Sequence, residues 1–594
     1  MIAENAQSSQ RHGAARKVLA VVLFLALAAG LVFSGASGFC FHVDDKKDSI
    51  SDKEGTGVGG LALFSTWPKD AKPDAVIILS GQTFGHVQPC GCSRPQMGGL
   101  ERRANFIDSL RKKNWPVAGV DLGDIHPDRH PLGAPPITTP PKQAILKYVA
   151  TMNALREMGY VAVGVGKTEF AAGLHNLTAE YALQKEQPPY ILAGNVSGKT
   201  VSREEFFPAA PGGKRPLLGL AEIADFGTLS IGIVGVIGKA PEDKGLDIEA
   251  PKLDSLIKID GAQATLKSAV ELLAASPKKP AVNVLIYQGT VEFAKLVAKD
   301  RPEFNVILCQ AEDSEPPQFP EYVDQPNGSK TMIVQVGHKG RYVGAVGVFK
   351  TAKGFDLKYE LVPLREEYLT PPDAASEKAH KILPLLEAYA QQVKDQNLLA
   401  KISPIPHPAQ IQSPNLNLTY IGSEKCVACH GGEHKKWEGT PHSHALDTLE
   451  KIAKRPGLRH LDAECVICHT VGFGFKTGYE NAEKTPNLKH VGCESCHGPG
   501  SGHASAEKNE TLLKYLSPWK QEKADKLPDV ELMEKLAKMN PVERGQVAIP
   551  AAQMRVINAV STACQKCHDV ENDPHFDLYK YWPKIAHSGL GGKK

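Results

Sequence analysis

Short apolar runs alternate with amphipathic stretches along residues 72–364 of this 594-residue chain. Short apolar runs between turn residues are typical of buried strands, whereas apolar residues that repeat about every 3.6 positions are typical of helices. Their alternation predicts an α/β domain. The expected strands are Ala75–Leu79, Val117–Leu122, Val161–Val165, Tyr190–Val196, Leu229–Ile237, Val282–Tyr287 and Val306–Leu308, and the expected helices are Gly99–Lys113, Lys142–Met158 and Gly261–Ala275.

The pattern changes towards the end of this domain. Thr331–Lys350 and Phe355–Leu364 predict a closing antiparallel hairpin, and a Leu- and Ala-rich stretch at Ala374–Leu399 predicts a helix. Proline interrupts helices and strands alike, so a domain boundary is expected at Pro404, Pro406, Pro408 and Pro414. The predicted divisions are an α/β domain at 72–372, a helix and linker at 373–418 and a C-terminal domain at 419–594.

An uncharged apolar run, Val18–Ala36, comes after Arg11, Arg16 and Lys17 near the N-terminus. Such a run is long enough to span a bilayer, and the preceding positive charge favours export of the residues beyond it. Its length favours a retained anchor, although the small residues 34–38 leave a cleaved signal peptide open. We therefore expect a cytoplasmic segment 1–17, a transmembrane segment 18–36 and a flexible tether 37–71 in a bacterial inner-membrane protein whose bulk lies in the periplasm.

The overall charge excludes one class of partner, and the cysteines are clustered. The formal net charge of +3 and the lack of a basic stripe interleaved with aromatic residues argue against nucleic acid as a partner. Eight of the twelve cysteines lie from Cys426 onward, and clustering of this kind indicates a cofactor site rather than scattered disulfides.

Those eight cysteines form four Cys-x-x-Cys-His motifs. Two cysteines at this spacing can form thioethers with one haem, and the adjacent histidine can ligate the iron from the proximal side. Two zinc sites are the alternative, but zinc does not require a histidine after every pair. We therefore expect four covalently bound haems, held by Cys426, Cys429 and His430 (first motif), Cys465, Cys468 and His469 (second), Cys493, Cys496 and His497 (third), and Cys564, Cys567 and His568 (fourth).

The same region contains eight further histidines, more than four irons need as second axial ligands. Histidine is a common second ligand in electron-transfer haems. The preferred candidates are His442 or His444, His503 and His587, and the others are His434, His460, His490 and His575. No histidine occurs in Thr470–Gly478 after the second motif, so that motif is the candidate for an open iron position.

Two phrases in the C-terminal region, Trp437–Ala445 and Val491–Gly500, resemble the tetrahaem cytochromes of the hydroxylamine-oxidising pathway. The resemblance extends over residues 420–587. It implies a mostly helical domain whose closely packed haem pairs pass electrons, and it allows one five-coordinate haem. The insertion Glu507–Val556 lies outside the matching motifs and is expected to add helices.

The α/β domain resembles calcineurin-like metallophosphoesterases of the 5′-nucleotidase type, which implies a sandwich of two sheets flanked by helices. The matching phrases are Ile78–Gly85, Gly98–Ala104, Val120–Asp124, Met158–Phe170 and Gly337–Gly344.

Most of that family's metal ligands have been replaced. Gln82 and Phe84 stand at the first Asp-x-His position, and Lys167 and Thr168 stand where Asn-His is usual. Tyr287 occupies a later histidine position, and only the carboxylate of Asp124 is retained. One carboxylate cannot hold two divalent ions, so neither a dinuclear metal site nor phosphoesterase activity is expected.

A thiol site is an alternative use of the same loops. Cys90, Cys92, Asp124 and Cys309 are candidates for a metal or redox site. Cys90 and Cys92 are too close in the chain for an unstrained disulfide, but small loop residues without a role are the plainer explanation.

Three functions remain open on these motifs. The first is an electron-transfer protein that works with redox proteins or quinol-linked donors. The second is an oxidoreductase that turns over a small substrate at a five-coordinate haem. The third, an active phosphohydrolase fused to a cytochrome, is disfavoured by the lost ligands.

Overall fold

A computed structural model describes residues 62–587, apart from residues 70, 211, 353 and 521 and the segments 90–95, 128–140, 183–186, 239–255, 453–456, 523–524, 570–571 and 574–575. The predicted membrane segment Val18–Ala36 lies outside these residues. No helix within the described ranges is long and apolar enough to cross a membrane.

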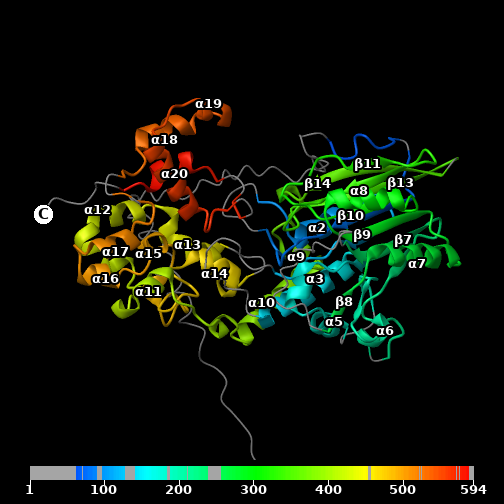
Figure 1. Ribbon diagram of the computed structural model, residues 1–594, viewed down its shortest axis with the longest axis horizontal. Coiled ribbons are helices and arrows are strands. Elements are labelled where there is room, and N and C mark those ends of the chain that lie inside the picture. The colour runs from blue at the N-terminus through cyan, green and yellow to red at the C-terminus, as the bar shows by residue number, and fades with distance from the viewer. Residues whose placement is uncertain are drawn as a thin grey trace, which may run out of the picture. The chain divides into compact units, whose positions relative to one another are not determined.

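The α/β region contains two six-stranded sheets (Figure 1). In the first sheet, β1 to β4 run parallel, and the hairpin β13–β14 adds two antiparallel strands beside β1. The strand order is β14 (Gly354–Pro363), β13 (Tyr342–Thr351), β1 (Ala75–Ser80), β2 (Val117–Asp121), β3 (Tyr160–Val163) and β4 (Tyr190–Ile191).

The second sheet also has parallel central strands, but it has an antiparallel strand at each edge. Its order is β11 (Glu321–Asp324), β12 (Lys330–Val334), β10 (Val306–Cys309), β9 (Val282–Gln288), β7 (Ser230–Ile237) and β6 (Ala221–Asp225). A separate two-stranded ribbon joins β5 (Val196–Gly198) and β8 (Ile257–Ile259).

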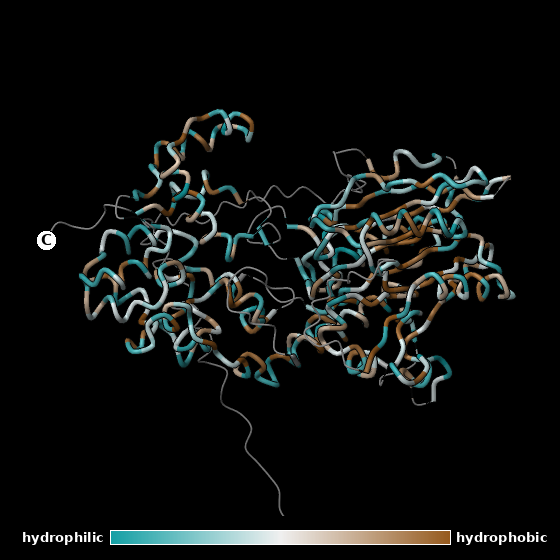
Figure 2. The backbone as a smooth tube through the Cα atoms, viewed as in Figure 1, coloured by the Kyte–Doolittle hydropathy of each residue, from teal (hydrophilic) through white to brown (hydrophobic). Residues whose placement is uncertain are grey.

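Successive residues of β1 face opposite sides of the first sheet. Ile77 and Leu79 join Val284 and Ile233 of the second sheet in one buried cluster, while Ile78 belongs to a different cluster. Because side chains alternate along a strand, one face of each sheet packs against the other sheet and the opposite face packs against helices. Figure 2 shows that hydrophobic positions are concentrated along the strands.

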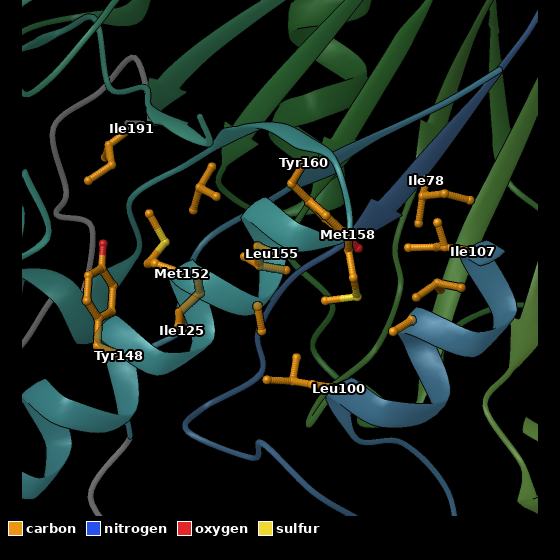
Figure 3. Close-up of a cluster of buried hydrophobic side chains, with 14 of the residues drawn as sticks. Ile78, Leu100, Ile107, Ile125, Tyr148, Met152, Leu155, Met158, Tyr160 and Ile191 are labelled. Atoms are coloured by element: carbon orange, nitrogen blue, oxygen red, sulfur yellow. The ribbon is translucent and has the colours of Figure 1, made fainter. Parts of the chain in front are cut away.

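Helices cover the outer face of each sheet. On the first sheet, Ile78 packs with Leu100 and Ile107 of α2 and Leu155 of α3 (Figure 3). On the second sheet, α7 and α8 contribute to another buried cluster. The predicted sandwich of two sheets flanked by helices is therefore confirmed, with helices α2 (Leu100–Lys112), α3 (Pro141–Glu157), α4 (Lys167–Ala172), α5 (Leu174–Ala182), α6 (Arg203–Phe206), α7 (Ala262–Ala275) and α8 (Val291–Asp300).

Two predicted strands needed correction. Thr331–Lys350 is not one arm of a hairpin, because β12 and β13 belong to different sheets and a turn at Gly337–Gly340 separates them. Tyr190–Val196 is divided between β4 and β5, because the Asn195 side chain bonds the backbone of Ile237 and interrupts strand pairing.

The predicted helix Ala374–Leu399 is also broken, into α9 (Ala374–Ala379) and α10 (Leu383–Asp395). The break has a local cause: Nδ1 of His380 accepts hydrogen bonds from the backbone N–H groups of Ile382 and Leu383. Pro384 then lies in the first turn of α10, where a missing N–H has no cost.

The C-terminal region is helical, as predicted, and the insertion Glu507–Val556 adds helices. The helices are mostly short. They are α11 (Pro408–Gln412), α12 (Val427–Glu438), α13 (Ala445–Asp447), α14 (Ala463–His469), α15 (Cys493–His497), α16 (Ser501–Ser505), α17 (Glu510–Tyr515), α18 (Val530–Ala537), α19 (Pro541–Gly545), α20 (Ala551–Cys564) and α21 (Leu578–Ile585).

Candidate functional site

Each Cys-x-x-Cys-His motif lies on a helical turn. The first motif opens α12, the second ends α14, the third forms α15, and the fourth begins at the last residue of α20. In the first and fourth motifs, the histidine N–H donates to the carbonyl of the first cysteine, at 2.9 Å for His430 and 3.0 Å for His568. A turn of this kind brings two cysteines three positions apart to one side of the backbone.

The motifs come together through their cysteine side chains. A side-chain hydrogen bond joins the thiols of Cys426 and Cys493, so the first motif meets the third. A second such bond joins Cys468 and Cys567, so the second motif meets the fourth. Cys496 of the third motif also interacts electrostatically with Cys564 and Cys567 of the fourth, so contacts between thiols connect all four motifs.

Three motif histidines have their Nδ1 atoms fixed by acceptors. His469 Nδ1 lies 2.6 Å from the Ala445 carbonyl oxygen, and His497 Nδ1 lies 2.6 Å from the Leu516 carbonyl oxygen. His568 Nδ1 lies 2.7 Å from a carboxylate oxygen of Asp573. Because Nδ1 must donate to these oxygens, Nε2 is left with a lone pair that can bind a metal.

Burial keeps several of these rings neutral. Desolvation lowers the pKa of His469 and of His497, and it lowers the pKa of His442 to about 4. Neutral imidazole is the form that ligates iron, so the electrostatics of the region agree with a ligand role.

Three motif histidines each face a second histidine. The ring centroids are 6.2 Å apart for His430 and His503, 6.2 Å for His497 and His587, and 6.1 Å for His568 and His442. A metal–imidazole nitrogen bond is about 2 Å long and the ring centre lies about 1 Å behind the nitrogen, so two rings that share one metal have centres about 6 Å apart. The spacing fits a haem iron between each pair of rings.

His469 of the second motif is different. Among the residues that the structure describes, no other imidazole faces it at such a separation. His444 instead faces His490, with centroids 6.2 Å apart, and neither belongs to a motif. Phe473, within the histidine-free stretch after this motif, belongs with Val466 to a buried apolar cluster that Cys465 borders.

The remaining spare histidines lie elsewhere. His434 is 3.6 Å from a carboxylate oxygen of Glu424. Burial lowers the pKa of His460, whose ring faces no motif histidine among the described residues. His575 lies outside the described residues.

Protein donors surround the carboxylates at the loops that resemble a phosphoesterase metal site. Asp124 Oδ1 accepts from the backbone N–H of Thr168 at 3.0 Å and from its hydroxyl at 3.2 Å. Glu169 accepts from the backbone N–H groups of Asp124, Ile125 and Gly166 at 2.7–3.0 Å. Donors supplied by the chain thus bond Oδ1 of Asp124 and both carboxylate oxygens of Glu169.

The substituted positions make other contacts. The Gln82 amide bonds the backbone of Ala311 in both directions, at 2.8 and 3.1 Å, and the Lys167 ammonium lies 6.0 Å from the centre of the Phe84 ring. Within the described ranges, no three or more His, Cys, Asp or Glu side chains gather in a way that could hold a metal ion.

The candidate thiol site can be located only in part. Cys90 and Cys92 lie outside the described residues. Cys309 ends β10 and is fully buried, and desolvation raises the pKa of its thiol to about 12. A buried thiol of this kind is unreactive at neutral pH.

Sequence reasoning missed the charged residues that join the two regions. Lys147 of α3 is buried and lies 3.2 Å from Asp462 and 2.8 Å from Glu464, directly before Cys465 of the second motif. Burial alone would lower the pKa of Lys147, but the two carboxylates raise it well above its usual value. Lysine on an amphipathic helix usually faces water, so no signal in the sequence marked this one.

Solved structures similar to this chain include two nucleotidases. The 5′-nucleotidase precursor from Thermus thermophilus has a TM-score of 0.41 at 18% identity, and the match covers 56% of this chain and 60% of that one. NAD nucleotidase from Haemophilus influenzae has a TM-score of 0.42 at 14% identity, and the match covers 62% of this chain and 69% of that one.

Sequence comparison concerns the C-terminal region. Cytochrome c-554 of Nitrosomonas europaea is 36% identical over 99 residues, which are 15% of this chain and 42% of that protein. The chain thus spans less than half the length of this curated relative. The family described as cytochrome c554 and c-prime matches residues 425–498, which contain the first three motifs. The C-terminal region therefore carries a cytochrome c554 domain.

Proposed function

We propose that this chain is a multihaem c-type cytochrome that transfers electrons and carries four covalently bound haems, one at each motif. The facing histidine rings carry the proposal, because three motif histidines each meet a second imidazole about 6 Å away. Bound haem supplies an iron that accepts and releases one electron. The thiols hold it, and the paired motifs bring the first site near the third and the second near the fourth.

The axial ligands follow from the facing pairs. With haem bound, His503 would supply the second imidazole at the first motif, His587 at the third and His442 at the fourth. Imidazole on both faces closes an iron to substrates and suits electron transfer. Within the described ranges no second imidazole faces His469, so a haem iron held at the second motif would keep an open position.

That open position favours a second candidate function, turnover of a small substrate at the second motif. Hydrolysis of phosphate esters is not proposed, because Lys167 and Thr168 stand where metal ligands are expected and Thr168 donates to Asp124. For the whole protein, we propose an inner-membrane anchor at Val18–Ala36, a periplasmic location, and redox proteins or quinol-linked donors as partners.

Haem content is the first test. Full-length protein from a host with c-type maturation is examined by intact-mass measurement and is expected to carry four covalent haems. The double variant Cys564→Ser, Cys567→Ser is expected to carry three. Zinc in place of added haem mass contradicts the proposal.

Spin state is the second test. Electron paramagnetic resonance of oxidised protein is expected to show about one high-spin haem in four, and its signal should shift with cyanide or nitric oxide. His503→Ala should add a second high-spin haem, whereas the control His434→Ala should not. A spectrum that is wholly low-spin and inert to ligands supports pure electron transfer and rejects the open position.

A further inference from the structure

A lysine of the α/β region occupies an unusual backbone conformation in the turn between β12 and β13. Lys339 has φ 59° and Gly340 has φ 62°, and the N–H of Arg341 bonds the carbonyl of His338 at 3.3 Å. Positive φ suits glycine or asparagine, so a lysine held there is strained. The backbone N–H of Lys339 bonds the carbonyl of Gln82 at 2.8 Å, which helps to hold the turn.

The side chain of this lysine reaches the loop that follows the fourth motif. Lys339 is only 8% exposed, and its Nζ donates to Oδ1 of Asn572 at 3.0 Å. Asn572 in turn donates from its backbone N–H and its side-chain amide to the carboxylate of Asp569, at 2.5 and 2.9 Å. The ammonium therefore supports Asn572, which is itself hydrogen-bonded to Asp569.

The same loop carries the carboxylate that bonds His568. Asp573, next to Asn572, is 2% exposed and accepts from Nδ1 of His568 at 2.7 Å. A carboxylate in this position makes the imidazole a more electron-rich ligand than a backbone carbonyl does. A more electron-rich ligand stabilises oxidised iron and lowers the reduction potential.

We propose that Lys339 is a positioning residue for the fourth haem, through which the α/β region sets the reduction potential of that haem. The proposal rests on haem binding at His568, as proposed above. Lys339 holds Asn572, Asn572 holds the loop, and the loop presents Asp573 to Nδ1 of His568.

A purely electrostatic effect would have the opposite sign. Removing a cation from the neighbourhood of a haem favours the oxidised, more positive state and lowers its potential. Loosening the loop weakens the bond between Asp573 and His568 and raises the potential. The direction of the shift therefore separates positioning from simple charge.

The experiment is a spectroelectrochemical titration of full-length, haem-loaded protein, resolved into one component per haem. Asp573→Asn identifies the component of the fourth haem by moving it to higher potential. Lys339→Met and the charge-neutral Asn572→Ala should move the same component in the same direction. Lys339→Arg should retain the wild-type value, and combining Lys339→Met with Asp573→Asn should add little to either change.

The control is Lys350→Met, an exposed lysine of β13 that should leave all components unchanged. An unchanged or lowered potential in Lys339→Met, together with an unchanged potential in Asn572→Ala, overturns the inference. If the wild-type protein itself does not show four haem components, the result contradicts the proposed function and not this inference. The two failures are therefore distinguishable.

Discussion

The α/β region and the haem-motif region reach folded structure by different means. In the first, strands such as β1 and β7 are buried along their whole length, and three apolar clusters lie between the layers of sheets and helices. In the second, most helices have eight residues or fewer, and the buried clusters are small. Helices this short are marginal alone, so the first region depends on its own apolar surface and the second on its cofactors.

The largest effect is expected when haem is withheld, because the two regions should then differ in how well they stay folded. Full-length chain made without c-type maturation should lose protection from hydrogen exchange over residues 419–587 and keep it over the sheets. The physical reason is that cofactor binding and folding are coupled when the ligands come from several short elements. Hydrogen exchange with mass spectrometry measures this, with the haem-loaded protein as the control. Equal protection of both regions in the haem-free chain would contradict the comparison.

The next effect concerns the contact between the regions. Lys147→Met leaves Asp462 and Glu464 without their buried cation, and removal of one partner of a buried ion pair costs about 3–5 kcal/mol. Urea unfolding of haem-loaded protein should show the loss. Lys142→Met, at an exposed position of the same helix, should change stability by less than about 0.5 kcal/mol. Similar effects for both variants would mean that the ion pair does not join the regions.

A smaller effect concerns pH and is confined to the α/β region. Burial, followed by the charge of Asp124, raises the pKa of Glu169 to about 8. A folded-state pKa above the unfolded value means that the folded state holds the proton more tightly, so stability is full below about pH 4.5 and falls as pH rises to 8. Urea midpoints measured across this pH range should fall more steeply for wild type than for Glu169→Gln. Parallel slopes would refute this role of Glu169.

The smallest expected effect is none. Full-length protein should not hydrolyse nucleoside monophosphates when manganese, zinc or cobalt is supplied, because Lys167 and Thr168 replace expected metal ligands and Thr168 already donates to Asp124. Assays of phosphate release from wild type and Asp124→Asn should give the same background. Metal-dependent release that disappears in Asp124→Asn would show that the substituted positions were wrongly assigned.

Periodicity predicted the central strands well because their burial is nearly complete. β1, β2, β7, β9 and β10 lie close to their predicted bounds, since a run of apolar residues between turns has few other stable uses. The prediction failed where a single polar side chain decided the structure. Asn195 interrupts a strand and His380 caps a helix. Many other asparagine and histidine residues have neither effect, so the residue type alone did not predict these breaks.

Haem chemistry could be predicted from the sequence because covalent attachment needs neighbouring residues. Two thiols and a histidine within about five positions are enough to recognise a haem motif, whatever the rest of the chain does. The second axial ligand carries no such constraint. His442 and His444 are equally plausible by spacing, yet only His442 faces His568.

By itself, then, the amino-acid sequence determined the class of fold and the four attachment motifs, because each depends on local periodicity or spacing. Tertiary structure alone decided which histidines face each other, which motifs pair, and that Lys147 and Lys339 contact the second and fourth motif segments. The bonds from these two lysines join residues 317 and 233 positions apart. Such partners are selected by the packing of whole elements, and no short-range pattern in the chain records that choice.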